Sequence, residues 1–176
     1  PGAAGAQLEG SKRFSKELMA RAGIPTAAYG SFTDEESALA YVREQGAPVV
    51  VKADGLAAGK GVVVALTLDE ALQAVHECFD GAFGAAGSTV VIEEMLTGPE
   101  CTLLAFTDGK AVRPMATSQD HKRALEGDLG PNTGGMGVYS PVPIVTDEEH
   151  AEMCRILDET IAAANREGID FRGCLY

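Results

Sequence analysis

The sequence VVVKADGLAAGKGVVVAL, residues Val49–Leu66, is the part of the chain from which its fold is most directly inferred. Runs of β-branched residues at Val49–Val51 and Val62–Val64 predict two strands. The intervening loop contains Gly55, Gly59 and Gly61. Glycine lets a backbone approach a ligand closely, and successive bare N–H groups suit phosphate oxygens. A mobile surface hairpin is the alternative, but Lys52 and Lys60 in an acidic chain favour a phosphate site.

This loop is not a Walker A motif, which needs four residues between its first glycine and Gly-Lys, then Ser or Thr and a helix. The spacing from Gly55 to Gly59 is one residue short, Gly61 replaces the hydroxyl residue, and a strand follows. The sequence therefore predicts a strand–loop–strand hairpin that folds over the phosphates of a nucleotide.

The composition limits the classes of partner. The chain has 176 residues, 45% of them hydrophobic and 23% charged, and a formal net charge of −12. This charge argues against nucleic acid and anionic membranes as partners, so an anionic ligand needs a local basic cluster. No apolar run reaches transmembrane length. Four scattered cysteines without a C-x-x-C pair argue against zinc and disulfides and predict a cytoplasmic protein. No nucleophile elbow occurs either.

The pattern along the chain predicts alternating helices and strands. Capping boxes at Thr33–Glu36, Thr67–Glu70 and Thr146–Glu149 each predict a helix start. The expected helices cover residues 11–22, 33–46, 67–79 and 146–168. The expected strands cover 26–32, 49–51, 62–64, 88–95, 101–107, 111–115 and the residues after 169. Asp108-Gly109 predicts a hairpin turn. We expect loops at residues 1–6 and 81–87, and an irregular stretch at 116–145.

This order predicts an α+β fold with two lobes and a nucleotide between them. Residues 25–96, in the order βαββαβ, form the expected small lobe. Residues 1–24 are expected to be a helical lead-in that belongs to the larger lobe, and residues 97–176 its first part. Both ends of the sequence look cut, so we expect a piece of a longer protein.

Three further stretches are candidate binding segments. Glu93-Glu94-Met95-Leu96 and Glu100 could meet an adenine and its ribose, although a solvated strand end is the preferred interpretation from these residues alone. Ser118–Arg123, SQDHKR, and Pro131–Gly137, PNTGGMG, fit either a disordered linker or a binding loop. The compact glycine-rich composition of the latter favours a binding loop.

With these segments in view, the chain resembles the glycinamide ribonucleotide synthetase family of the ATP-grasp superfamily. The matching stretches are LEGSKRFSKELM, IPTA, VVKADGLAAGKGVVVA, VIEEML, ATSQDHKR, GPNTGGMGVYSPVP and GCLY. The resemblance implies an ATP-grasp fold. It also implies a ligase of purine biosynthesis that joins glycine to 5-phosphoribosylamine through glycyl phosphate, releasing ADP and phosphate.

The resemblance also implies a role for each matching residue. Lys12 and Lys52 would hold the ATP phosphates, and the loop with Gly55, Gly59, Lys60 and Gly61 would close over them. Glu93, Glu94, Met95 and Leu96 would frame adenine, and Glu100 the ribose. Arg123 and Asn132 would act with Lys52 near the phosphates. Asp120, Gly134, Gly135, Met136 and Gly137 would face glycine and the ribonucleotide.

The sequence departs from the family pattern in three ways. Pro99 stands where the family usually has an acid, so only Glu100 can serve there. The family's N-terminal domain is expected to be missing, and so are its magnesium ligands, which we expect beyond residue 176 and not within this chain. A poorly active piece is therefore expected. The alternatives are a nucleotide-binding module of another carboxylate–amine ligase or carboxylase, and a non-catalytic fragment.

Overall fold

The computed structural model describes residues 2–55, 61–127 and 129–176 and divides into two compact units. Unit A is Ala6–Thr97, and unit B is Pro1–Gly5 with Gly98–Tyr176. We expected boundaries after residues 24 and 96, whereas the first boundary between the units follows Gly5. Most of the helical lead-in, from Ala6 on, therefore groups with the sheet residues that follow it. The assignment of residues 1–24 to a larger lobe stays a prediction.

Two helices open the chain. The first, α1 (Ala3–Gly10), occupies part of the stretch that we expected to be a loop, so that expectation was wrong. Its alanines have the highest intrinsic helix propensity, which offsets the glycines. The second, α2 (Lys12–Ala22), begins where the Ser11 side chain accepts a hydrogen bond from the Phe14 N–H. It ends at Gly23, whose φ of 68° suits glycine.

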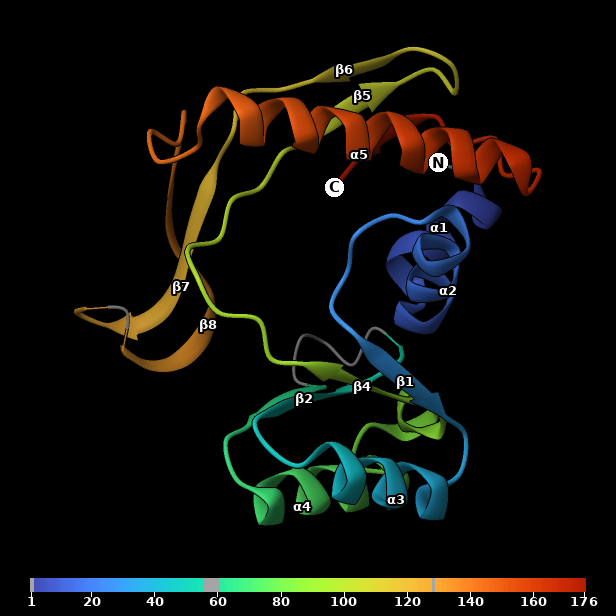
Figure 1. The fold of residues 1–176 in the computed structure, drawn as a ribbon, viewed down its shortest axis with the longest axis vertical. Helices are drawn as coiled ribbons and strands as arrows, with labels where there is room; N and C mark the ends of the chain where they lie inside the picture. Colours follow the sequence, from blue (N-terminus) through green and yellow to red (C-terminus); the bar gives the residue numbers. More distant parts are fainter. Residues whose placement is uncertain (1, 56–60, 128) are drawn as a thin grey trace. The chain divides into compact units, whose positions relative to one another are not determined.

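Unit A is built on a four-stranded antiparallel sheet in the order β1-β4-β2-β3. The strands are β1 (Tyr29–Phe32), β2 (Val49–Ala53), β3 (Val62–Ala65) and β4 (Val90–Glu94). Helices α3 (Glu35–Gln45) and α4 (Leu68–Phe79) cover one face of this sheet (Figure 1). The predicted order βαββαβ is confirmed.

The core of unit A lies between this sheet face and the two helices. Val49, Val51 and Ala53 of β2 and Val90 and Ile92 of β4 are buried there against α3 and α4. Successive strand residues point to opposite faces, so the polar residues between them lie on the other side of the sheet. This alternation is what places Lys52 and Glu93 away from the apolar core.

Helix starts follow the capping boxes in two cases of three. Thr67 with Glu70, and Thr146 with Glu149, form both reciprocal hydrogen bonds of a capping box. The box predicted at Thr33 was wrong, because Asp34 is the N-cap of α3 and accepts from the Ser37 N–H. The loop expected at residues 81–87 was also partly wrong, since a 3₁₀ turn, η1 (Gly84–Ser88), precedes β4.

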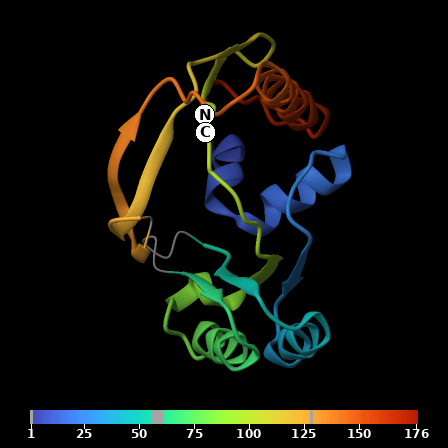
Figure 2. The same cartoon turned by 60° about the vertical axis from the view of Figure 1, so that its left-hand side comes forward.

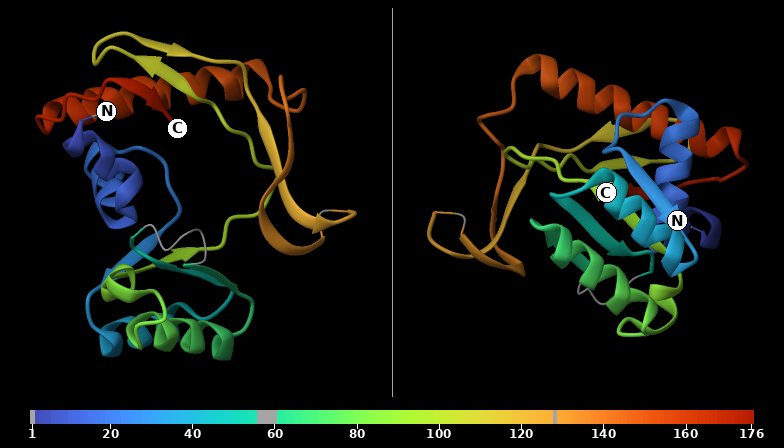
Figure 3. Two further views of the ribbon diagram at one scale, coloured as in Figure 1. Left: turned by 180° about the vertical axis from the view of Figure 1, so that it is seen from behind. Right: turned by 60° about the horizontal axis from the view of Figure 1, so that its bottom comes forward.

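Unit B contains a three-stranded sheet in the order β6-β5-β9 and the longest helix. The strands are β5 (Ala105–Thr107), β6 (Val112–Pro114) and β9 (Gly173–Leu175), and the helix is α5 (Asp147–Arg166). The hairpin at Asp108-Gly109 is confirmed, with Asp108 accepting from the Lys110 and Ala111 N–H groups. Helix α5 runs alongside this hairpin (Figure 3), and its Asn165 side chain donates to the Gly109 carbonyl.

The second feature of unit B is a long two-stranded ribbon. Strand β7 (Gln119–Leu125) pairs antiparallel with β8 (Leu129–Tyr139), and the two run side by side in gold and orange in Figure 2. The irregular stretch that we expected at residues 116–145 was therefore wrong over most of its length. Most ribbon side chains are exposed, so no apolar alternation marks these strands in the sequence. Among the described helices, none is long and apolar enough to span a bilayer.

Candidate functional site

A pocket of about 400 Å³ lies within unit A, beside α2 and the start and end of the glycine loop. Four of the predicted nucleotide residues line it: Lys12, Gly55, Gly61 and Glu93. Its other lining residues, which the sequence did not indicate, are Leu8, Glu9, Ser15, Lys16, Met19 and Val62. The pocket thus combines ammonium groups and bare backbone with an apolar wall, as a nucleotide site requires. Gly59 and Lys60 lie outside the described residues.

The Lys12 ammonium holds the start of the glycine loop. It donates to the carbonyl oxygens of Ala53, Asp54 and Gly55 at 2.8, 3.3 and 3.0 Å. Burial lowers the pKa of Lys12 below its usual value, and the positive charge of Lys52 lowers it further, while Asp54 opposes the shift. The first residue of α2 is therefore a partly desolvated cation at the pocket.

Asp54 also binds the N-terminal end of α2. Its carboxylate accepts from the Arg13 N–H at 2.6 Å and from the Ser11 hydroxyl at 3.0 Å. A carboxylate at a helix N-terminus is stabilised by the unpaired N–H groups and the helix dipole. Asp54 was not among the predicted site residues, because its partners precede it by about forty positions.

Lys52 and Glu93 are diagonal neighbours on β2 and β4, where Val50 pairs with Glu93 and Lys52 with Val91. The Lys52 ammonium donates to Glu93 Oε2 at 2.9 Å. The same oxygen lies 3.3 Å from the ammonium of Lys16, a residue that the sequence analysis missed. Nothing in its helical spacing marks Lys16, because the apolar stripe of α2 runs through other positions.

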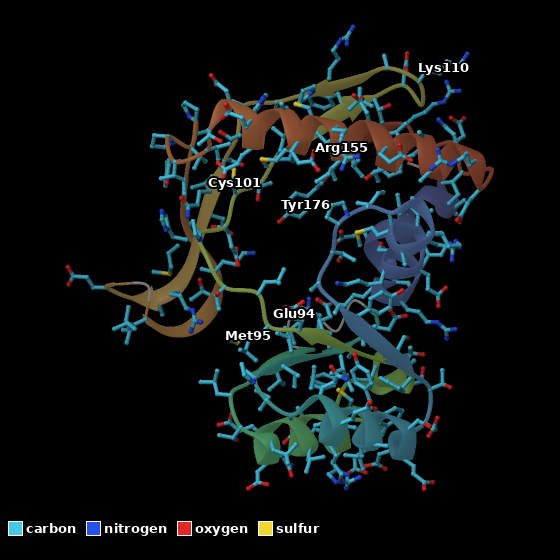
Figure 4. All side chains as sticks on the ribbon, in the orientation of Figure 1. Glu94, Met95, Cys101, Lys110, Arg155 and Tyr176 are labelled. Atoms are coloured by element: carbon cyan, nitrogen blue, oxygen red, sulfur yellow. The ribbon has the colours of Figure 1, made fainter. Side chains whose placement is uncertain are left out.

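The remaining predicted adenine residues follow β4. Glu94 and Met95 lie at the end of this strand (Figure 4), and the Glu94 side chain is exposed. The Glu94 N–H donates to the Ala28 carbonyl at 2.9 Å, and its Oε2 accepts from the Ala28 N–H at 3.4 Å. Leu96 is 68% exposed. None of these three lines the pocket, so their role at adenine stays a prediction.

The other predicted residues gather in the ribbon of unit B. Arg123 is paired with Asn132 across β7 and β8, and its guanidinium donates to the Gly130 carbonyl at 2.8 Å. Asp120 packs against Gly135, where an added Cβ would lie 2.9 Å from Asp120 Oδ1. This oxygen is buried and has no hydrogen-bond partner among the described residues.

The ribbon also carries Gly134, Met136 and Gly137, and Gly137 pairs with His121. Glu100 is exposed, with its carboxylate 3.9 Å from the Lys122 ammonium. The structure thus brings the two sequence motifs SQDHKR and PNTGGMG together as paired strands. The ribose, glycine and ribonucleotide roles assigned to these residues stay predictions.

A divalent metal finds no suitable ligand set in the described parts of the chain. No group of three or more His, Cys, Asp or Glu residues that could hold a metal ion occurs in residues 2–55, 61–127 and 129–176. Magnesium needs hard oxygen ligands, commonly carboxylates and phosphates. We therefore assign no step to a metal held by these residues.

The four-stranded sheet with two helices on one face, together with the family match and structural similarity described below, identifies the chain as an ATP-grasp protein. The biotin carboxylase domain of the 2-oxoglutarate carboxylase from Hydrogenobacter thermophilus, crystallised with MgADP, ADP and bicarbonate, shares this fold. Its TM-score is 0.73 at 22% identity, over 96% of this chain and 36% of that one. The family model for the ATP-grasp (A) domain of phosphoribosylglycinamide synthetase matches residues 10–176, and the chain belongs to this family.

Two relatives within this family are more similar. The phosphoribosylamine–glycine ligase of Rhizobium meliloti (strain 1021) is 58% identical over 177 residues, which cover 100% of this chain and 42% of that protein. The crystal structure of the Thermotoga maritima phosphoribosylamine–glycine ligase has a TM-score of 0.88 at 34% identity, over 96% of this chain and 43% of that one. The chain thus spans less than half the length of these relatives.

Proposed function

We propose that this chain is the ATP-binding part of a cytoplasmic phosphoribosylamine–glycine ligase of purine biosynthesis. In the proposed reaction, a glycine carboxylate oxygen attacks the γ-phosphorus of ATP and ADP leaves. The amine of 5-phosphoribosylamine then attacks the carbonyl carbon of glycyl phosphate. Phosphate leaves with the C–O bond electrons, the amine loses a proton, and an amide, glycinamide ribonucleotide, remains.

The observation that carries this proposal is the family match over residues 10–176, together with relatives named as this ligase. The pocket in unit A supports it independently of those names. It brings Lys12, Gly55, Gly61 and Glu93 to one place in a chain whose net charge is −12. An acidic protein has no general attraction for a nucleotide, so placed ammonium groups and N–H donors must supply it.

The chemistry suits such a site. A carboxylate is a poor electrophile, and phosphorylation supplies a leaving group. Phosphoryl transfer depends on alignment and charge neutralisation more than on covalent help from the protein. Lys52 would hold phosphate oxygens, and Lys12 would do so by exchanging one of its three carbonyl partners for a phosphate oxygen. The loop that begins at Gly55 and ends at Gly61 would offer its N–H groups.

The remaining roles follow the family resemblance. We assign Glu93 to Leu96 to the adenine, Glu100 to the ribose, and Arg123 with Asn132 to the phosphates. Asp120 and residues 134–137 would face glycine and the ribonucleotide. The buried Asp120 oxygen has no partner among the described residues, which supports this assignment, because such an oxygen is expected to meet a donor.

Two measurements test the proposal. Calorimetric titration of the chain with ADP should give saturable binding. In the longest reading frame that contains the chain, ADP release from ATP should require both glycine and 5-phosphoribosylamine. Release that depends instead on bicarbonate would assign the chain to an ATP-grasp carboxylase, and ADP binding without any substrate-dependent release would leave a nucleotide-binding module.

A further inference from the structure

The ammonium group of Lys16 is almost completely buried in unit A. Its side chain is 8% exposed, and that of Glu93 is also 8% exposed. The ammonium donates to Thr26 Oγ1 at 2.7 Å and to the Ala27 carbonyl at 3.2 Å, and it lies 3.3 Å from Glu93 Oε2. It also lies over the Tyr29 ring, 5.4 Å from the centroid. Two of its three donors thus have hydrogen-bond acceptors, and the ammonium is also ion-paired with Glu93.

Lys52 contacts the same carboxylate oxygen, but it is more exposed and, among the described residues, has fewer partners than Lys16. Its side chain is 26% exposed, and within the described residues its ammonium has one hydrogen-bond acceptor, Glu93. Two of its three donors are therefore available to a ligand as far as these residues are concerned. One carboxylate oxygen thus contacts both a buried ammonium that has two other acceptors and a more exposed ammonium that has no other acceptor among the described residues.

The charges around the pocket explain why this sharing matters. The ammonium groups of Lys12, Lys16 and Lys52 stand against three carboxylates, those of Glu9, Asp54 and Glu93. Without Lys16, the negative charge of Glu93 would be balanced by Lys52 alone, and the local sum would fall by one. Partly buried charges are screened much less than exposed ones, so an anionic ligand would experience this change.

We propose that Lys16 is a positioning residue for nucleotide binding: it shares Glu93 with Lys52 and so leaves the Lys52 ammonium available to a phosphate oxygen. Lys16 lines the same pocket, and in this proposal it acts through the carboxylate and not by donating to the ligand. This inference rests on the proposed function, because it presupposes a phosphate-bearing ligand at Lys52.

The test compares ADP with adenosine, which lacks phosphates, in four variants. Lys16→Met keeps the length of the side chain and removes its charge, Glu93→Gln removes the carboxylate charge, and the double variant removes both. Lys110→Met, an exposed lysine in the β5–β6 turn (Figure 4), is the matched control for loss of one charge. We expect Lys16→Met to weaken ADP binding by about tenfold, as for the loss of a buried charge. The affinity for adenosine, measured by competition, should not change.

In the Glu93→Gln background, Lys16→Met should cause little further loss of ADP affinity, because Lys16 acts through that carboxylate. A second readout needs no nucleotide: site-resolved acetylation of Lys52, followed by mass spectrometry, should slow in Lys16→Met, where Glu93 holds Lys52 alone. It should return to at least the wild-type rate in the double variant. The acetylation rate shows how accessible the Lys52 ammonium is even in a variant that binds no nucleotide.

Unchanged ADP affinity in Lys16→Met, an equal loss for ADP and adenosine, or additive losses in the double variant would each overturn the proposal. So would an unchanged Lys52 acetylation rate in Lys16→Met. Failure of the proposed function has a different signature. The wild-type chain would then bind no ADP, while the acetylation rates would still show whether Glu93 is shared.

Discussion

Replacing Asp54 by alanine should loosen the N-terminal end of α2 from the glycine loop. The carboxylate accepts from the Arg13 N–H at 2.6 Å and from the Ser11 hydroxyl at 3.0 Å. Hydrogen bonds to a charged group contribute about 1.5–3 kcal/mol each, and partial exposure reduces this value. The Phe14 N–H keeps its bond to Ser11, so α2 retains its own cap. We therefore expect a loss of about 2 kcal/mol in the free energy of local opening of α2.

Native-state hydrogen exchange measures this quantity directly. A loss of about 2 kcal/mol corresponds to roughly 30-fold faster exchange of the α2 amides. Asp34→Ala is the matched control, because Asp34 caps α3 through local contacts with Ser37, including a bond from the Ser37 N–H. Asp34→Ala should lower the free energy of local opening of α3 by about 1 kcal/mol and leave that of α2 unchanged. Asp54→Asn, which keeps one acceptor oxygen, should fall between wild type and Asp54→Ala.

The result that would refute this reasoning is specific. If α2 in Asp54→Ala exchanges at the wild-type rate while α3 in Asp34→Ala exchanges faster, the contact between Asp54 and the helix end contributes no stability. The Lys12 ammonium, which donates to three successive carbonyls of the same segment, would then have to hold α2 at the loop by itself.

Three further outcomes follow from the site and its surroundings. Lys52→Ala should weaken ADP binding by roughly 1–3 kcal/mol, the loss of a charge-assisted partner, and equal affinities by calorimetry would contradict this role. Because the pKa of Lys12 is lowered, this lysine loses its proton, and ADP affinity should fall, at a lower pH than for an ordinary lysine. Lys12→Arg should move that fall to higher pH, and identical pH profiles would exclude Lys12 as its source. Gly87→Ala should lower the free energy of unfolding in urea by about 1–3 kcal/mol or more, since the new Cβ would lie 2.2 Å from the Cys78 carbonyl oxygen. Gly10→Ala, with nothing within 4 Å, is its control and should not destabilise the chain.

Unit A was predictable because its signals are local. The valines of β2 and β3 bracket the glycine loop, and Thr67 and Glu70 lie within one helical turn, so each pattern can be seen in a short window. The start of α3 was misplaced for the same reason. Thr33 and Asp34 are both good N-cap residues at adjacent positions, and only the extended backbone and the Ser37 contact of Asp34 distinguish them.

The ribbon of unit B was not predictable from such windows. Strands β7 and β8 are held by backbone pairing between Gln119–Leu125 and Leu129–Tyr139, with two register irregularities. A ribbon with both faces largely exposed needs no apolar alternation, and glycines such as Gly134 and Gly137 are normally depleted in strands. Composition therefore indicated a loop where pairing forms a strand. That both motifs are binding segments stays a prediction.

Glu93 illustrates how the structure adds contacts that the sequence prediction lacks. The sequence analysis predicts that it belongs to a segment, Glu93–Leu96, that frames the adenine. In the structure its carboxylate also meets the ammonium groups of Lys16 and Lys52, from α2 and β2. One side chain would then connect the base and the phosphate ends of a nucleotide, so replacing Glu93 alone changes both at once. A cycle with Lys16 separates them, because Lys16 contacts the same Glu93 oxygen as Lys52 and is proposed to act through it.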